Sequence, residues 1–145
     1  MLSTIPGGSR SAPKTDAFVR QSTWAGRLSH AQLAVVLEHA EERCFAAGDC
    51  VLHAGDVVEH WTGIAEGFAK MSVTSAQGRV STLTGVCSGV WFGEGSLMKH
   101  ERRRYDVYAL RPLRLALVPR QVFEWLRQTS FPFNQYRSEE HTSEL

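Results

Sequence analysis

The spacing of hydrophobic residues changes about a third of the way along the chain. Before the change, these residues recur at three- and four-residue intervals, which is the spacing of one face of a helix. They are Trp24, Leu28, Leu33, Val36, Leu37 and Ala40. Ser29 is a suitable N-cap, and Gln32 can complete a capping box with it. We therefore predict a helix over about residues 29–42, with a looser helical turn before it.

After Cys44 the hydrophobic runs become short and are separated by glycine. Turn signals follow one another every seven to twelve residues, which is typical of short strands in an all-β sandwich or roll. Two further strands fit RYDVYAL and LRLALV, with Arg111-Pro112 between them. Pro119 then suits the first position of a helix that ends at residues 130–132. The pattern predicts a mainly β fold of about eight strands, with one helix before and one after.

Two local patterns refine this prediction. In FAKMSVTS the residues Phe68, Met71 and Val73 do not alternate strictly, so we expect one bulge or burial on both faces of the strand. Gly48-Asp49 and Gly55-Asp56 form a near-repeat, and each supplies the backbone freedom of a tight corner. We expect these corners to form turns and not a binding site.

The chain of 145 residues has the length of one domain that can bury a core. Its first residues, MLSTIPGGSRSAPKTD, are rich in serine, glycine and proline and lack the apolar segment of a signal peptide. We predict a flexible arm over residues 1–17 and a folded domain over residues 18–136.

The charge balance gives no reason for nucleic acid to bind over the whole surface. There are 16 Lys and Arg against 15 Asp and Glu, a net charge of +1, and only ERRR at 101–104 concentrates positive charge. The odd number of cysteines (Cys44, Cys50 and Cys87) and the absence of C-x-x-C favour reduced thiols in a cytoplasmic protein. No apolar run reaches the length of a membrane-spanning helix, so we expect no membrane partner.

Several segments occur in an order that resembles a known family. They are FAAGDCVLHAGD, WTGIAEGFAKMSV, WFGEGSL, RRYDVYAL and LALVPRQVFEWL. Together they resemble the N-terminal cyclic-nucleotide-binding sensor domain of the Crp/Fnr transcription regulators, over about residues 43–136. The resemblance implies a double-stranded β-helix, that is, a jelly-roll-like β-roll. It also implies a homodimeric parent protein that binds DNA through a C-terminal helix-turn-helix domain missing from this chain.

The resemblance also implies a ligand site. Phe92-Gly93-Glu94 would end a strand and open a short helix, so that backbone N–H groups near Gly95 and Ser96 point at a phosphate. Glu94 would accept a hydrogen bond from the ribose 2′-hydroxyl, and Arg103 would clamp the cyclic phosphate. Arg104, beside it, is included as a candidate ligand-binding residue.

Strand alternation supports Arg103 as the phosphate arginine. Arg103, Tyr105, Val107 and Ala109 share one face of the expected strand, and Arg104 lies on the other. Where the cyclic-nucleotide binders of the family have a small Ser or Thr followed by Ala, this chain has Arg104 and Tyr105. An inward Tyr105 would occupy volume that a nucleotide needs, and Asp106 beside the pocket would disfavour an anion. The ligand is therefore expected to be a cyclic nucleotide or another small anionic effector.

Other interpretations of these residues stay open. Glu94 can stabilise a helix N-terminus without any ligand, and Arg102–Arg104 can be a solvated run balanced by Glu101. The chain would then be a degenerate β-roll that serves as an oligomerisation or interaction scaffold. A cupin-like metal site needs clustered ligands, but the spacing of His53 and His60 is wrong for one, so no metal is expected. No catalytic motif is present, so we expect no enzyme.

The last nine residues, RSEEHTSEL at 137–145, are polar and acidic. They interrupt what should be the start of an apolar-striped dimerisation helix, and they read like a translated sequencing adapter. We therefore expect residues 137–145 to be a non-native tail.

Overall fold

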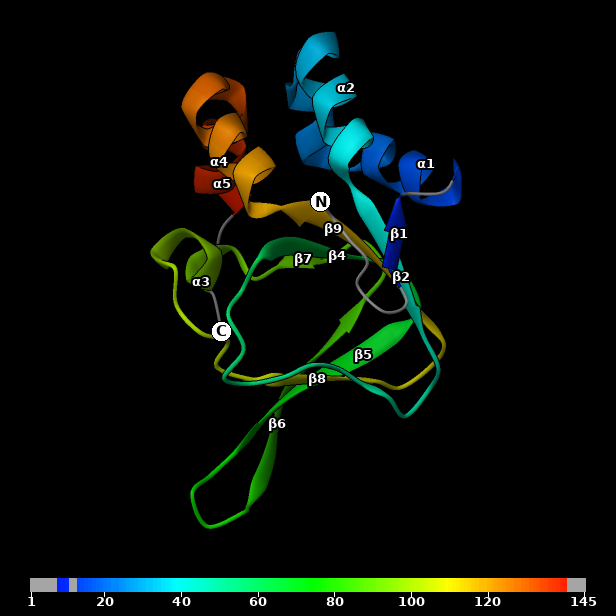
Figure 1. Cartoon of the computed structure of the whole chain (residues 1–145), viewed down its shortest axis with the longest axis vertical. Helices are drawn as coiled ribbons and strands as arrows, with labels where there is room; N and C mark the ends of the chain where they lie inside the picture. Colours follow the sequence, from blue (N-terminus) through cyan, green and yellow to red (C-terminus); the bar gives the residue numbers. More distant parts are fainter. Residues whose placement is uncertain (1–7, 11–12, 141–145) are drawn as a thin grey trace.

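Two antiparallel sheets face each other and enclose the interior of a roll (Figure 1). The structure is a computed structural model and describes residues 8–10 and 13–140. Its strands are β1 (Gly8–Arg10), β2 (Glu41–Phe45), β3 (Cys50–Leu52), β4 (His60–Glu66), β5 (Phe68–Thr74), β6 (Val80–Cys87), β7 (Trp91–Phe92), β8 (Asp106–Ala109) and β9 (Leu113–Pro119). One sheet has the order β1-β2-β9-β4-β7 and the other β3-β8-β5-β6.

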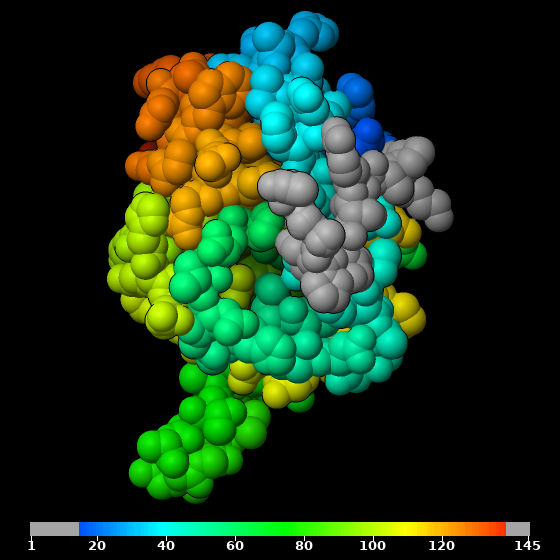
Figure 2. Space-filling view, in the orientation of Figure 1, coloured from blue at the N-terminus to red at the C-terminus, as the bar shows by residue number. Residues whose placement is uncertain are grey.

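The helices gather mainly on one side of the roll. They are α1 (Pro13–Gln21), the 3₁₀ helix η1 (Thr23–Arg27), α2 (His30–His39), α3 (Glu94–Lys99), α4 (Arg120–Thr129) and α5 (Phe131–Glu140). Figure 1 shows α1, α2, α4 and α5 over the sheet that contains β4 and β9, with α3 at the side of the roll. At the opposite end the β5–β6 hairpin projects from the body of the molecule (Figure 2).

The predicted fold is confirmed in its main features. The eight strands β2 to β9 form the roll, with helices before and after them. Ser29 caps α2, and its capping box with Gln32 is complete: Gln32 N donates to Ser29 Oγ at 3.1 Å, and Ser29 N donates to Gln32 Oε1 at 2.9 Å. In β5 the expected burial on both faces is found, since Met71 and Ser72 are both buried, and the bulge of the β5–β6 pair has its extra residue, Leu83, in β6. The corner at Gly55 is a turn, with φ at 95°.

The N-terminal segment differs from the expected flexible arm over residues 1–17. Within the described residues, 8–10 form β1, antiparallel to β2, and α1 already begins at Pro13. Thr15 is buried, and its Oγ1 donates to Glu42 Oε1 at 2.6 Å, while Val19 is fully buried. The serine, glycine and proline content of this segment concealed these anchors, because each of them depends on a residue distant in sequence. Residues 1–7 and 11–12 lie outside the described residues.

The hydrophobic core has two parts, one on each face of the helix-covered sheet. Alternation along β4 sends Trp61 towards the helices, where it meets Trp24 and Phe123, and sends Ile64 into the roll. The interior of the roll is filled mainly by residues of β5, β8 and β9. The helices thus pack on an aromatic layer, and the ligand site predicted from the sequence falls at the edge of the inner core.

The C-terminal helix includes part of the expected non-native tail. Residues 137–140 continue α5, and 141–145 lie outside the described residues. The origin of these residues stays a prediction.

Candidate functional site

The turn into α3 brings two of the predicted site residues together. Gly93 has φ at 92°, a left-handed conformation that glycine adopts without strain, and it is the N-cap of α3. A Cβ at this position would lie 4.0 Å from Arg103 Nη1 and 3.7 Å from the carbonyl oxygen of His60. The end of the Arg103 side chain therefore lies against the turn, which is the arrangement that the family resemblance implies.

Arg103 is buried at this position, with 7% of its surface exposed. Its backbone is fixed in both directions by the loop before β4: Arg103 N donates to Asp56 O at 2.7 Å, and Gly55 N donates to Arg103 O at 2.8 Å. Its guanidinium carbon lies 5.7 Å from the centre of the Tyr105 ring. A buried arginine head group with a fixed backbone is pre-organised to receive an anion.

The predicted alternation around Arg103 is confirmed. Tyr105, Val107 and Ala109 are buried like Arg103, whereas Arg104 is exposed and its Nη2 lies 2.9 Å from Glu101 Oε1. The structure therefore places Arg104 outside the roll, in the surface charge run that was the alternative interpretation.

Tyr105 and Asp106 lie on opposite faces. The Tyr105 ring is inside the roll, 6.5 Å from the Phe92 ring, so it occupies interior volume as expected. The expectation that Asp106 stands beside the pocket is wrong, because its Oδ1 accepts a hydrogen bond from Ala54 N at 2.8 Å on the outer side of the sheet. The alternation that turns Tyr105 inward turns Asp106 outward.

Positive charge concentrates around His60. The pKa of His60 is lowered from 6.5 to about 4, mainly by burial and in addition by the neighbouring Arg43, Arg103 and Arg120. Burial also lowers the pKa of Arg43 and raises that of Glu41, whose Oε1 lies 3.8 Å from His60 Nε2. At neutral pH the imidazole is uncharged, and the three arginines around it outnumber the single carboxyl group of Glu41, so positive charge is in excess here.

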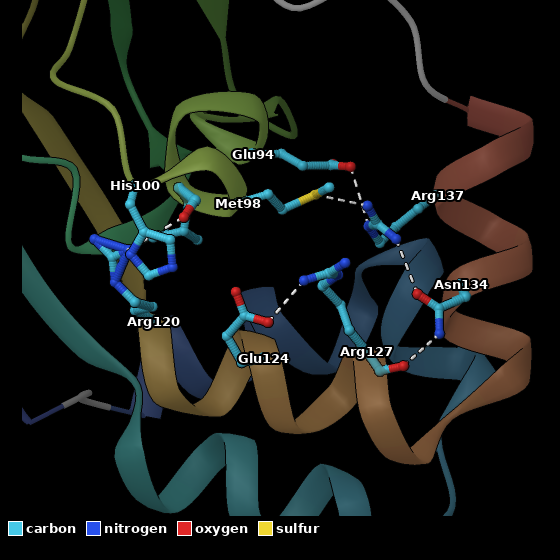
Figure 3. A network of polar contacts seen from close by, with 9 residues as sticks. Glu94, Met98, His100, Arg120, Glu124, Arg127, Asn134 and Arg137 are labelled. Carbon is cyan, nitrogen blue, oxygen red and sulfur yellow. Dashed lines mark hydrogen bonds and ion pairs between the residues drawn. The ribbon is translucent and has the colours of Figure 1, made fainter.

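Glu94 is engaged with α5 rather than with Arg103. Its Oε2 accepts from Arg137 Nε at 3.0 Å, and both side chains are mostly buried. Arg137 also donates to Asn134 Oδ1 at 2.9 Å and to Met98 Sδ at 2.8 Å (Figure 3). For Glu94 to bind a ligand hydroxyl, it must share or leave this ion pair.

Arg120, at the start of α4, links this helix to α3. Arg120 Nη1 donates to Leu97 O at 3.1 Å and lies 3.0 Å from His100 Nδ1, and its Nη2 donates to Val58 O. Gly95 and Ser96 lie in the first turn of α3 and are partly exposed. Sequence reasoning missed Arg43, Arg120 and Arg137, because only the tertiary structure shows that they converge on this region.

The two histidines that the sequence analysis considered as metal ligands, His53 and His60, have different surroundings in the structure. His60 is mostly buried next to Glu41, and His53 is exposed after β3. Among the described residues, the side chains close enough to share an ion are Cys50, His53 and Asp106, and His60 is not one of them.

No described helix has the length and apolar character needed to span a membrane.

Comparisons with known proteins agree with the fold. The family model for the cyclic nucleotide-binding domain matches residues 42–130. The sensor domain of the transcriptional regulator DNR from Pseudomonas aeruginosa superimposes with a TM-score of 0.75 at 15% identity, over 88% of this chain and 93% of that one. No curated protein matches the sequence.

Two longer solved structures share the fold. The catabolite activator protein of Thermus thermophilus has a TM-score of 0.67 at 21% identity, over 81% of this chain. The regulatory domain of Toxoplasma gondii PKA, solved with cAMP, has a TM-score of 0.71 at 22% identity, over 87% of this chain. The chain spans 55% of the Thermus structure and 47% of the Toxoplasma one.

Proposed function

Because the chain belongs to the cyclic nucleotide-binding domain family, we propose that it is the ligand-sensing domain of a Crp/Fnr-type transcription regulator. In this proposal the longer protein is a homodimer, and the sensor controls a DNA-binding domain elsewhere in that protein. The likeness in fold to the DNR sensor domain and to the catabolite activator protein supports it. The domain would act by binding and not by catalysis.

One observation carries the proposal: the buried guanidinium of Arg103 lies against the Gly93 turn. An arginine guanidinium presents its N–H donors in a planar fork that matches a phosphate or a carboxylate. The position also adjoins the first turn of α3. Together these groups suit a phosphate or a carboxylate.

The ligand class follows from the same site. A cyclic nucleotide is the first candidate, and cAMP occupies the related Toxoplasma structure. Tyr105 and Phe92 occupy interior volume next to Arg103, so a small anionic effector fits more readily unless Tyr105 moves. No resident cofactor is proposed beyond this effector.

The response would pass through α3. This helix is tied to α4 by Arg120 and to α5 by the Glu94–Arg137 pair. A ligand hydroxyl that takes Glu94 competes with Arg137, so binding would favour the state in which α5 is released. Arg137 begins the segment expected to be non-native, so this competition is proposed for the chain as given.

The test is a calorimetric titration of the chain with cyclic AMP, cyclic GMP and a cyclic dinucleotide. Saturable binding that weakens roughly tenfold or more in Arg103→Ala, and is unchanged in Arg104→Ala, supports the sensor. Arg104 is the matched control, because it is the neighbouring arginine on the exposed face. Binding that is equally strong in Arg103→Ala would contradict the proposed site.

The second candidate function is a scaffold that binds no small molecule. It is favoured by Tyr105, which fills part of the interior, and by Glu94, which already has an ionic partner. Tyr105→Ala separates the two candidates. A sensor whose pocket is only restricted should bind a cyclic nucleotide more tightly after this change, whereas a scaffold should bind none before or after it.

A further inference from the structure

Three side chains of different chemistry meet on the outer face of the β3–β8 pair, away from the proposed effector site. They are the thiol of Cys50, the imidazole of His53 and the carboxylate of Asp106, and their ligand atoms all lie within 4.8 Å of one another. Cys50 begins β3, His53 follows that strand, and Asp106 begins β8. We call these three residues the outer cluster.

The spacing within the outer cluster is close to that of a zinc site. Zinc binds cysteine sulfur at about 2.3 Å and histidine nitrogen at about 2.0–2.1 Å, so tetrahedral angles place the two ligand atoms about 3.6 Å apart. Cys50 Sγ and His53 Nδ1 are 3.4 Å apart. Two of the three ligands therefore already stand at nearly the required separation, and the carboxylate needs only a small side-chain movement.

The backbone that carries the cluster is fixed. Asp106 Oδ1 accepts from Ala54 N at 2.8 Å, which holds the residue after His53 against the start of β8. Asp56 N donates to His53 O at 3.2 Å and closes the turn. Asp106 keeps a second carboxylate oxygen for an ion while the first holds the loop.

We propose that Cys50, His53 and Asp106 bind a Zn²⁺ ion, with water as the fourth ligand. Thiolate, imidazole and carboxylate are the three ligand types that zinc takes in proteins, whereas Mg²⁺ and Ca²⁺ prefer oxygen alone. Binding replaces the Cys50 thiol proton, which passes to solvent, and the ion then bonds to sulfur.

The site would also affect the segment that carries Arg103 and leads into β8. Asp106 follows Arg103 by three positions, and the loop that bears His53 bonds to the Arg103 backbone at Gly55 and Asp56. An ion that links this loop to β8 would reduce the motion of Arg103. The proposal does not depend on the effector, because the ion lies on the opposite face of the strand.

The first test needs no substitution. The purified, reduced and metal-free chain is treated with iodoacetamide with and without Zn²⁺, and the alkylation of each cysteine is measured by peptide mass spectrometry. Zn²⁺ should slow the alkylation of Cys50 at least about tenfold and leave Cys44 and Cys87, which are exposed outside the cluster, unchanged. Equal alkylation of Cys50 with and without Zn²⁺, or equal protection of all three thiols, would overturn the proposal.

The second test uses variants and Co²⁺ as a spectroscopic substitute for Zn²⁺. The chain should show the charge-transfer band of a cobalt–thiolate bond, and the band should disappear in Cys50→Ser and persist in Cys44→Ser. Competition with a chromophoric chelator should show a loss of Zn²⁺ affinity of at least about tenfold in His53→Asn and in Asp106→Asn. Asp106→Asn keeps an oxygen for the Ala54 amide, so its loss reports on the metal and not on the loop. A cobalt band that survives in Cys50→Ser would contradict the assignment.

Discussion

Replacing Gly63 by alanine is expected to damage the contact between the sheet and the aromatic layer. Gly63 lies in β4 opposite Trp91 of β7. A Cβ at Gly63 would lie 2.6 Å from Trp91 Cε2, which is closer than two non-bonded carbon atoms can approach. One of the two groups must therefore move.

The Trp91 ring has little room to move. It stacks on Phe18 with ring centres 5.6 Å apart, and its centre lies 5.1 Å from Trp24 and 4.7 Å from Trp61. Overpacking of this kind typically costs about 1–3 kcal/mol. For a chain of this length, that corresponds to a fall of roughly 3–10 °C in the melting temperature.

The assay is thermal unfolding followed by circular dichroism, with Gly26→Ala as the matched control. A Cβ at Gly26 would meet no atom within 4 Å, so this substitution should be neutral or slightly stabilising. Trp91 leads directly into the Gly93 turn, so Gly63→Ala should also weaken effector binding. A Gly63→Ala variant that melts at or above the temperature of the unsubstituted chain would show that Trp91 does not oppose a Cβ at this position.

Three further predictions follow from the interior and its ion pairs. Tyr105→Ala should lower the unfolding free energy by about 3–5 kcal/mol in urea titrations, since it removes a buried ring; a loss below 1 kcal/mol would show that the ring does not fill the roll. The pKa of His60 is about 4 when folded and near 6.5 when unfolded, so the unfolded chain binds more protons between these values. The contribution of His60 to stability should therefore be complete above pH 6.5, and the unfolding free energy should decrease by up to about 3 kcal/mol as the pH falls to 4. An equal decrease in His60→Gln would contradict the assignment to this residue. Arg137→Ala should lower the unfolding free energy by about 1–2 kcal/mol, because it breaks the mostly buried pair with Glu94. Arg104→Ala, which breaks an exposed pair, should lower it by less than about 0.5 kcal/mol. Equal losses in the two variants would show that burial does not strengthen the Glu94–Arg137 pair.

The sequence allowed local patterns to be predicted, and these were largely correct. The capping box at Ser29, the burial on both faces of β5 and the inward face that carries Arg103 all depend on residues a few positions apart. The same alternation rule, applied to Asp106, would have placed its carboxylate outside the roll.

Contacts between distant segments could not be predicted. The ion pair of Glu94 with Arg137 joins α3 to α5, and the outer cluster joins β3 to β8. The spacing of these residues along the sequence does not indicate that they are in contact. The packing of α1 was missed for the same reason, because Thr15 bonds to a carboxylate of β2.

We propose that the Gly93 turn and Arg103 together receive an anion. The most direct measurement is a crystal structure of the chain grown with the effector that binds most strongly in calorimetry. We expect a phosphate or carboxylate within hydrogen-bond distance of the Arg103 guanidinium and of the first-turn amides of α3. An effector bound elsewhere, with Arg103 and the Gly93 turn uninvolved, would contradict it.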